Sequence, residues 1–225
     1  MQADATDDVG QVFESGTDVT FTLTGISDFT LDTTVNTLTE ISFFGGDGND
    51  TFTNNTAFES VARGGNGNDI LNGGEGADLF FGGDGNDTLR GGAGEDMLYG
   101  QIGDDLIFGD AGNDTLSGEA GSDRLMGGDN DDKIYGGDGD DVINGELGDD
   151  SGIGGDGNDV IVGSEGVDYL DGGDGTDLLQ GEAGDDVLVG GADDDQAIGG
   201  DGNDLLLGGT GTDLLFGNGG LDRIY

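Results

Sequence analysis

The sequence predicts an all-β protein, a right-handed parallel β-solenoid with two short-stranded parallel sheets and a line of turns along each edge. Two observations carry this prediction. From residue 64 to residue 225, the chain divides into eighteen units of nine residues without insertion or deletion. Each unit follows the pattern G-G-x-G-x-D-x-U-x, where U is usually a large apolar residue, and all copies keep Gly at position one and Asp at position six. Such a strict period indicates that every unit meets its neighbours in one fixed geometry.

The two halves of the unit predict a turn and a strand. The first six residues are rich in Gly and acidic residues, which is typical of a tight turn because Gly tolerates positive φ angles. The last three residues are apolar or β-branched and suit a very short strand. Two units then make one coil, and nine coils stack. Position four is Asn130 and Asp193 in two copies, and we expect both to adopt the left-handed conformation.

Position eight is expected to form the core, because side chains alternate along a strand and positions seven and nine then point outward. The residues at this position are Leu71, Phe80, Leu89, Leu98, Ile107, Leu116, Leu125, Ile134, Ile143, Ile161, Leu170, Leu179, Leu188, Leu206, Leu215 and Ile224. The pattern fails at Gly152 and Ala197, each of which precedes an Ile. We expect a small gap in the core there, rather than a slipped strand that would bury Ile153 or Ile198.

The first 63 residues depart from the regular repeat. We expect residues 1–16 to be a flexible leader and residues 17–63 to be a β-rich N-terminal cap that contains a strand at 19–24. The cap includes one complete unit at 45–53 and a degenerate unit at 54–62. In the degenerate unit, Glu59 would take the Asp position and Val61 the core position, and Arg63 would be one extra residue that resets the phase. Residues 64–225 form the roll of eighteen units.

Composition excludes several classes of function. The chain has 50 acidic and 5 basic residues and a net charge of −45, so it repels nucleic acid and anionic membranes. No apolar run is long enough to cross a membrane. The chain lacks Cys and His and has a single Lys, Lys133, so we expect no catalytic nucleophile with its base, and no enzyme activity. The evenly spaced carboxylates instead predict a bound cation.

The unit resembles the nonapeptide of the RTX (repeats-in-toxin) calcium-binding family, whose repeats form a parallel β-roll. The resemblance covers residues 64–225 completely and reaches back to residues 45–53. It implies that Ca²⁺ lies between turns on the same edge, one coil apart, bound by position-six Asp side chains and backbone carbonyls of the Gly-rich turn. Up to sixteen ions would fit between the complete turns. Hard oxygen ligands of this kind favour Ca²⁺ over transition metals.

This resemblance assigns ligands residue by residue. One edge would hold Asp69, Asp87, Asp105, Asp123, Asp141, Asp159, Asp177, Asp195 and Asp213, preceded by Asp50 of the first unit. The other edge would hold Asp78, Asp96, Asp114, Asp132, Asp150, Asp168, Asp186, Asp204 and Asp222. Backbone carbonyl ligands would come from Gly65, Gly67, Gly74, Gly76, Gly83, Gly85, Gly92, Gly94, Gly137, Gly139, Gly155, Gly157, Gly173, Gly175, Gly200, Gly202, Gly209 and Gly211.

The function expected from these features is a calcium-binding structural module of a secreted bacterial RTX protein. Low hydrophobicity and high charge predict disorder without calcium, and the resemblance implies type I export followed by folding in extracellular calcium. Two alternatives remain open. The chain could be an adhesin, surface-layer or matrix element that self-associates with calcium, or the C-terminal chaperone and secretion module of an RTX enzyme or toxin. In each case, we expect the chain to be a piece of a longer protein, whose other domains could pack on the apolar outer positions of the roll.

Overall fold

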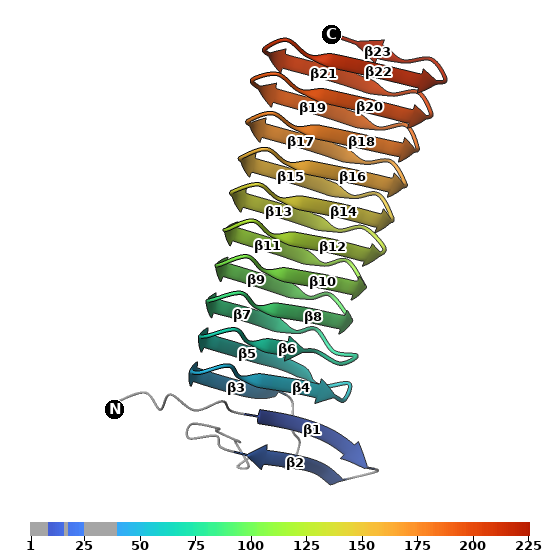
Figure 1. The fold of residues 1–225 in the computed structure, drawn as a ribbon. Coiled ribbons are helices and arrows are strands. Elements are labelled where there is room, and N and C mark those ends of the chain that lie inside the picture. The colour runs from blue at the N-terminus through green and yellow to red at the C-terminus, as the bar shows by residue number, and fades with distance from the viewer. Residues whose placement is uncertain (1–8, 16–17, 25–39) are drawn as a thin grey trace.

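The computed structural model of the protein describes residues 9–15, 18–24 and 40–225. These residues form strands and turns and no helix, and the chain winds into a β-solenoid of about ten turns (Figure 1). One sheet has 12 strands in the order β2-β1-β4-β6-β8-β10-β12-β14-β16-β18-β20-β22, and the other has 11 in the order β23-β21-β19-β17-β15-β13-β11-β9-β7-β5-β3. From β3 onward, successive strands along the chain alternate between the two sheets, whereas β1 and β2 belong to the same sheet. The predicted all-β fold with two parallel sheets is therefore confirmed.

The strand bounds follow the nine-residue period. The first sheet contains β1 (Val9–Ser15), β2 (Asp18–Thr24), β4 (Thr51–Asn55), β6 (Ile70–Asn72), β8 (Thr88–Ala93), β10 (Leu106–Ala111), β12 (Arg124–Asp129), β14 (Val142–Leu147), β16 (Val160–Glu165), β18 (Leu178–Ala183), β20 (Gln196–Asp201) and β22 (Leu214–Gly219). The second contains β3 (Glu40–Asp47), β5 (Glu59–Asn66), β7 (Leu79–Asp84), β9 (Met97–Ile102), β11 (Thr115–Ala120), β13 (Lys133–Asp138), β15 (Ser151–Asp156), β17 (Tyr169–Asp174), β19 (Val187–Ala192), β21 (Leu205–Thr210) and β23 (Arg223–Ile224).

The strands are longer than the sequence predicts. Strand β10 runs from position seven of one unit to position three of the next and has 6 residues, so the turn proper contains only positions four to six. Position one interrupts the pairing, since Phe108 and Asp110 pair with Arg90 and Gly92 of β8 while Gly109 between them has no paired residue. Gly at this position turns a face without a side chain toward the interior, and the strand continues past it.

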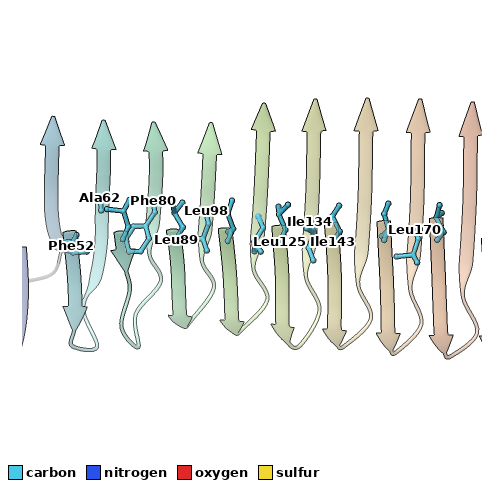
Figure 2. Packing of buried hydrophobic residues seen from close by; sticks show 14 of the residues in the cluster. Phe52, Ala62, Phe80, Leu89, Leu98, Leu125, Ile134, Ile143 and Leu170 are labelled. Atoms are coloured by element: carbon cyan, nitrogen blue, oxygen red, sulfur yellow. The ribbon is translucent and has the colours of Figure 1, made fainter. Parts of the chain in front are cut away.

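Position eight forms the core, as predicted. Its side chains lie in a single file between the two sheets, and those from Leu71 to Leu206 are at most 1% exposed (Figure 2). The file ends near the C-terminus, where Leu215 is only partly buried and Ile224 is 49% exposed. One buried apolar side chain per unit therefore fills the space between the sheets.

The two units without a large residue at position eight keep their register. Gly152 pairs with Ile134 and Leu170, and Ile153 stays on the outer face, so the strand does not slip. The gap expected at Gly152 is wrong, because facing side chains already fill it. A Cβ atom at Gly152 would lie 3.0 Å from Ile161 Cγ2 and 3.4 Å from Ile143 Cγ2.

The two irregular residues at position four adopt the expected backbone conformation. Asn130 has a φ angle of 81° and Asp193 one of 77°. Both turns therefore keep the shape that Gly gives to other copies, which confirms the prediction.

The N-terminal part differs from the expected leader and cap. Strands β1 and β2 form an antiparallel hairpin, and β1 pairs in parallel with β4 (Figure 1). The strand predicted at 19–24 is present as β2, but β1 lies within the range predicted to be a flexible leader. Val9, Val12 and Phe13 give this segment a β-propensity, and pairing with β4 covers the end of the sheet. Residues 25–39 of the expected cap lie outside the described residues.

The degenerate unit has a different phase from the one predicted. Ala62, not Val61, takes the core position, since Ala62 pairs with Phe80 and is 0% exposed. Ser60, not Glu59, lies one coil before Asp78 and is 1% exposed. The extra residue therefore belongs to the turn before Ser60. Arg63 instead holds an outward position, where its guanidinium lies 4.6 Å from the Phe81 ring centroid.

Candidate metal-binding turns

Each position-six Asp closes a turn and is buried where the next strand begins. From Asp50 to Asp204, the Asp residues at this position are 1–3% exposed. Their main chain joins successive coils, as in the hydrogen bond from the Thr88 N–H to the Asp69 carbonyl at 2.9 Å. Because the main chain of each Asp is hydrogen-bonded to the next coil, the side chain is held in one orientation.

One carboxylate oxygen of each Asp is hydrogen-bonded to the coil before it. The backbone N–H of Asp69 donates to Asp87 Oδ1 at 2.7 Å, and the N–H of Asp87 donates to Asp105 Oδ1 at 2.7 Å. The same bond repeats at intervals of 18 residues along both edges, up to Asp213 on one and Asp222 on the other. The structure therefore brings the predicted Asp residues together in two rows, as the repeat implies.

In most of these Asp residues, the second oxygen, Oδ2, is buried where no hydrogen-bond donor of the described residues reaches it. Within the described part of the chain, the buried Oδ2 atoms that accept no hydrogen bond belong to Asp69, Asp87, Asp96, Asp105, Asp114, Asp123, Asp132, Asp141, Asp150, Asp159, Asp168, Asp177, Asp186, Asp195 and Asp204. A buried carboxylate oxygen without a donor is costly. Its regular repetition along the solenoid fits a row of binding sites for a cation.

At most of these turns, a backbone carbonyl points into the same space as the Oδ2 atom. A Cβ atom built on Gly64 would collide with both Asp69 Oδ2 and the carbonyl oxygen of Gly82 in the next coil. Gly82 repeats the arrangement with Asp87 Oδ2 and the Gly100 carbonyl. Two acceptor oxygens that converge without a donor form a suitable environment for a cation, so the residues present fit a bound metal ion.

These position-one carbonyls are candidate ligands that the sequence did not indicate. The carbonyls that converge with an Oδ2 atom belong to Gly64, Gly82, Gly91, Gly100, Gly109, Gly127, Gly136, Gly145, Gly154, Gly163, Gly172, Gly190, Gly199 and Gly208. Strict retention of Gly at position one is the available signal, but a tight turn alone also accounts for it. Position-two and position-four carbonyls point along the stack, as Gly65 and Gly67 do toward Gly83 and Gly85. Their role as ligands stays a prediction.

The donor set of each turn is mixed. Among the described residues, no three acidic side chains converge as a metal-binding group. A bound ion would therefore need carbonyl oxygens in addition to the carboxylate. Carboxylate and carbonyl oxygens together are the ligands that Ca²⁺ prefers, with six to eight around each ion.

Burial raises the pKa of the row carboxylates. The pKa of Asp132 rises to about 8 and that of Asp69 to about 7, chiefly because burial removes the carboxylate from water. The N–H bond from the preceding coil acts in the opposite direction, and the neighbouring Asp residues in the row raise the pKa further. The turns thus disfavour a bare negative charge, and a nearby divalent cation would restore the ionised form.

A second ladder lies outside the first, at position five. The backbone N–H of Asn86 donates to Asn68 Oδ1 at 3.1 Å, and the N–H of Ser122 donates to Asp104 Oδ1 at 3.0 Å. These side chains are exposed and tie many of the turns to the next one on the solvent side. They position the turns without facing the space beside the buried Oδ2 atoms.

The fold and the turns together define a class, a parallel β-roll with a row of buried carboxylate sites along each edge. The family model for the RTX calcium-binding nonapeptide repeat matches residues 42–55, 61–89, 81–116, 117–152, 147–179, 171–206 and 198–225. The chain therefore belongs to the RTX calcium-binding repeat family. A comparison with curated proteins found no match. Such repeats in a β-solenoid fit a calcium-binding structural module, and this fold is not typically catalytic.

Proposed function

We propose that this chain is a structural module that folds around calcium ions bound between its coils. The observation that carries the proposal is the repeated pair of a donorless Asp Oδ2 and a neighbouring Gly carbonyl, as at Asp69 and Gly82. Asp50 and the position-six Asp residues from Asp69 to Asp222 are the proposed ligands, apart from Asp78, whose two carboxylate oxygens both accept hydrogen bonds. Up to sixteen ions would lie between the complete turns. When bound, calcium supplies the positive charge that these oxygens lack.

Charge repulsion makes the ions necessary for folding. Neighbouring coils lie about 4.8 Å apart, and at that distance two carboxylates repel each other by about 1 kcal/mol in bulk water and about 3–4 kcal/mol at an effective dielectric constant near 20. The net stability of a domain is only about 5–15 kcal/mol. With a net charge of −45 and one large core residue per unit, the metal-free chain is expected to be disordered.

A calcium titration tests this proposal. The chelated protein is expected to give the far-ultraviolet circular dichroism spectrum of a disordered chain. Strand signal should then rise cooperatively as calcium increases toward about 10⁻⁴–10⁻³ M, the range of extracellular calcium modules. Equilibrium dialysis would give the number of bound ions, and magnesium at equal ionic strength is the control. A strand-rich chelated protein that calcium leaves unchanged would overturn the proposal.

The calcium requirement fits export. RTX repeats are typical of secreted bacterial proteins, and a chain that stays unfolded at low cytosolic calcium could pass through a type I channel and fold outside the cell. No helix in the described residues is long and apolar enough to span a membrane. The export proposal can be tested by measuring secretion of the chain through a type I system. Secretion should be lost in a variant engineered to fold without calcium.

Self-association is a second candidate function, favoured by apolar side chains exposed near β22 and β23. Leu214 is 51%, Phe216 42%, Leu221 84% and Tyr225 76% exposed. Sheets that present such residues can pack on another copy or another domain. Sedimentation at saturating calcium separates the candidates, because a monomeric module would remain one species as concentration rises. Replacement of Leu214 and Phe216 by Ser should abolish any larger species.

A further inference from the structure

One carboxylate in the two rows has a different set of hydrogen bonds from the rest. Asp78 Oδ1 accepts the backbone N–H of Ser60 at 2.7 Å and the Ser60 hydroxyl at 2.6 Å. Its Oδ2 accepts the N–H of Gly74 at 3.0 Å. By comparison, Asp96 and Asp114 on the same edge accept a bond on Oδ1 and none on Oδ2 within the described residues. Both oxygens of Asp78 thus have hydrogen-bond donors from the protein, whereas the buried Asp residues of the regular turns have a donor among the described residues on one oxygen only.

The turn that faces Asp78 is closed by its own side chains. Asn54, which is 1% exposed, donates its amide N–H to the Phe58 carbonyl at 2.8 Å. Its Oδ1 accepts the backbone N–H of Thr56 at 3.0 Å and the Thr56 hydroxyl at 2.7 Å. Thr56 Oγ1 in turn accepts the N–H of Phe58 at 3.1 Å. Hydrogen bonds between uncharged groups therefore hold this turn together. In the regular turns, by contrast, the converging oxygens have no donor among the described residues and would need a cation.

The following turn on this edge departs from the repeat as well. Gly92 and Gly94 have φ angles of 110° and 130°, whereas Gly74 and Gly76 are not in the positive-φ region. Strand β6 ends early, at Asn72, and the Gly74 N–H turns to Asp78 instead of following the regular pattern. The turn with the extra residue before Ser60 and the turn with the bend at Gly74 therefore both bond to Asp78, which links them to each other.

Aromatic packing reinforces the same coils without any ion. In the core, the ring centroids of Phe43 and Phe52 lie 5.2 Å apart, and those of Phe52 and Phe80 lie 5.9 Å apart. On the outer face, the Arg63 guanidinium lies over Phe81. Within the described residues, the buried aromatic side chains of the core belong to this N-terminal region. Larger apolar contacts thus coincide with the uncharged turn.

We propose that the turns 54–60 and 73–78 form a calcium-independent lock, at which β4 to β7 stay folded when the other coils have lost their ions. The lock would serve as the template on which the C-terminal coils assemble as calcium binds, since repeat folds propagate from neighbour to neighbour. This inference rests on the proposed function, because it contrasts the lock with coils that require calcium. It assigns Asp78 a hydrogen-bonding role in place of the ligand role expected from the repeat.

Hydrogen exchange followed by mass spectrometry on the whole chain tests the lock. In chelator, peptides that cover residues 54–62 and 73–81 should remain protected, while those from 181–207 exchange as an unfolded chain. In calcium, both regions should be protected. If calcium protects both regions but chelator exposes both equally, the lock is wrong and the proposed function stands. If chelator leaves both protected, calcium-dependent folding fails, and with it the contrast on which the lock depends.

Two substitutions assign the protection to these side chains. Asn54→Ala removes the centre of the turn, and the milder Ser60→Ala removes one donor to Asp78. In chelator, each should lower the protection of 54–62 and 73–81 by about tenfold or more, because buried polar partners lose their bonds. Asn113→Ala is the matched control, since Asn113 is an exposed turn residue on the same edge. Unchanged protection in Ser60→Ala and Asn54→Ala, or an equal loss in Asn113→Ala, would overturn the proposal.

Discussion

The backbone N–H of Asp132 donates to Asp150 Oδ1 at 2.8 Å, while Asp132 Oδ2 is buried without a hydrogen-bond partner in the described structure. Apart from Asp78, each buried carboxylate of the row therefore has one oxygen that joins the coils and one oxygen that has no hydrogen-bond donor among the described residues. The hydrogen bond on Oδ1 stabilises the stacking of the coils, and Oδ2 is the atom that would bind the proposed ion. This division means that the two roles can be separated by substitution.

Asp132→Asn should weaken calcium binding and leave the hydrogen bond between coils in place. Asn keeps an oxygen that can accept the Asp114 N–H, but it removes the charge that attracts calcium. We expect the calcium midpoint of folding to rise, and fewer ions to bind at saturation in equilibrium dialysis. Asp131→Asn removes the same charge at the adjacent, exposed position and should change the midpoint little. Equal shifts in the two variants would show that net charge, and not the buried oxygen, controls binding.

Acid should stabilise the metal-free fold. Burial raises the pKa of Asp132 to about 8 and of Asp96 and Asp105 to about 7 in the folded chain, above their ordinary value of 3.8. Groups with a raised folded pKa bind protons more tightly in the folded state, so their stabilising effect is present at low pH and is lost as pH rises through about 6–8. In chelator, strand signal should therefore be larger at pH 5 than at pH 8.

The calcium-bound protein should show the opposite pH dependence. Protons compete with calcium for the same carboxylates, so the calcium midpoint of folding should rise as pH falls from about 8 to about 5. Circular dichroism with calcium and with chelator at matched pH would separate the two effects. Parallel pH curves in the two conditions would contradict the assignment of the row carboxylates to the metal.

The sequence predicted the parts of this fold that large or charged side chains mark. Position eight gave the core and position six gave the two rows, because an apolar or acidic residue recurs at each. Position one carries Gly, and a residue without a side chain shows neither burial nor a ligand role, so the strand length and the carbonyls of residues such as Gly82 were missed. The phase of the degenerate unit could not be predicted for a related reason, since Ala62 and Ser60 are small residues without a distinctive pattern.

Position-one Gly should tolerate no side chain, in contrast to Gly in the core. A Cβ atom at Gly109 would collide with Asp114 Oδ2 and with the Gly127 carbonyl oxygen. The carbonyl belongs to the main chain and cannot move unless its strand moves as well. Gly109→Ala should therefore lower the free energy of unfolding in calcium by about 3 kcal/mol or more, and should also reduce the number of bound ions, because the methyl group fills the space of the proposed ion.

Gly152→Ala is the matched control for this prediction. Its Cβ would meet only side-chain methyl groups, at 3.0 Å from Ile161 Cγ2 and 3.4 Å from Leu170 Cδ2. Small rotations of these side chains can relieve such contacts, so the free energy of unfolding should fall by about 1 kcal/mol, the low end of the cost of overpacking a core, with no loss of ions. Thermal unfolding in saturating calcium and equilibrium dialysis measure both quantities. If Gly109→Ala keeps its full complement of ions, the space beside Asp114 Oδ2 is not a metal site.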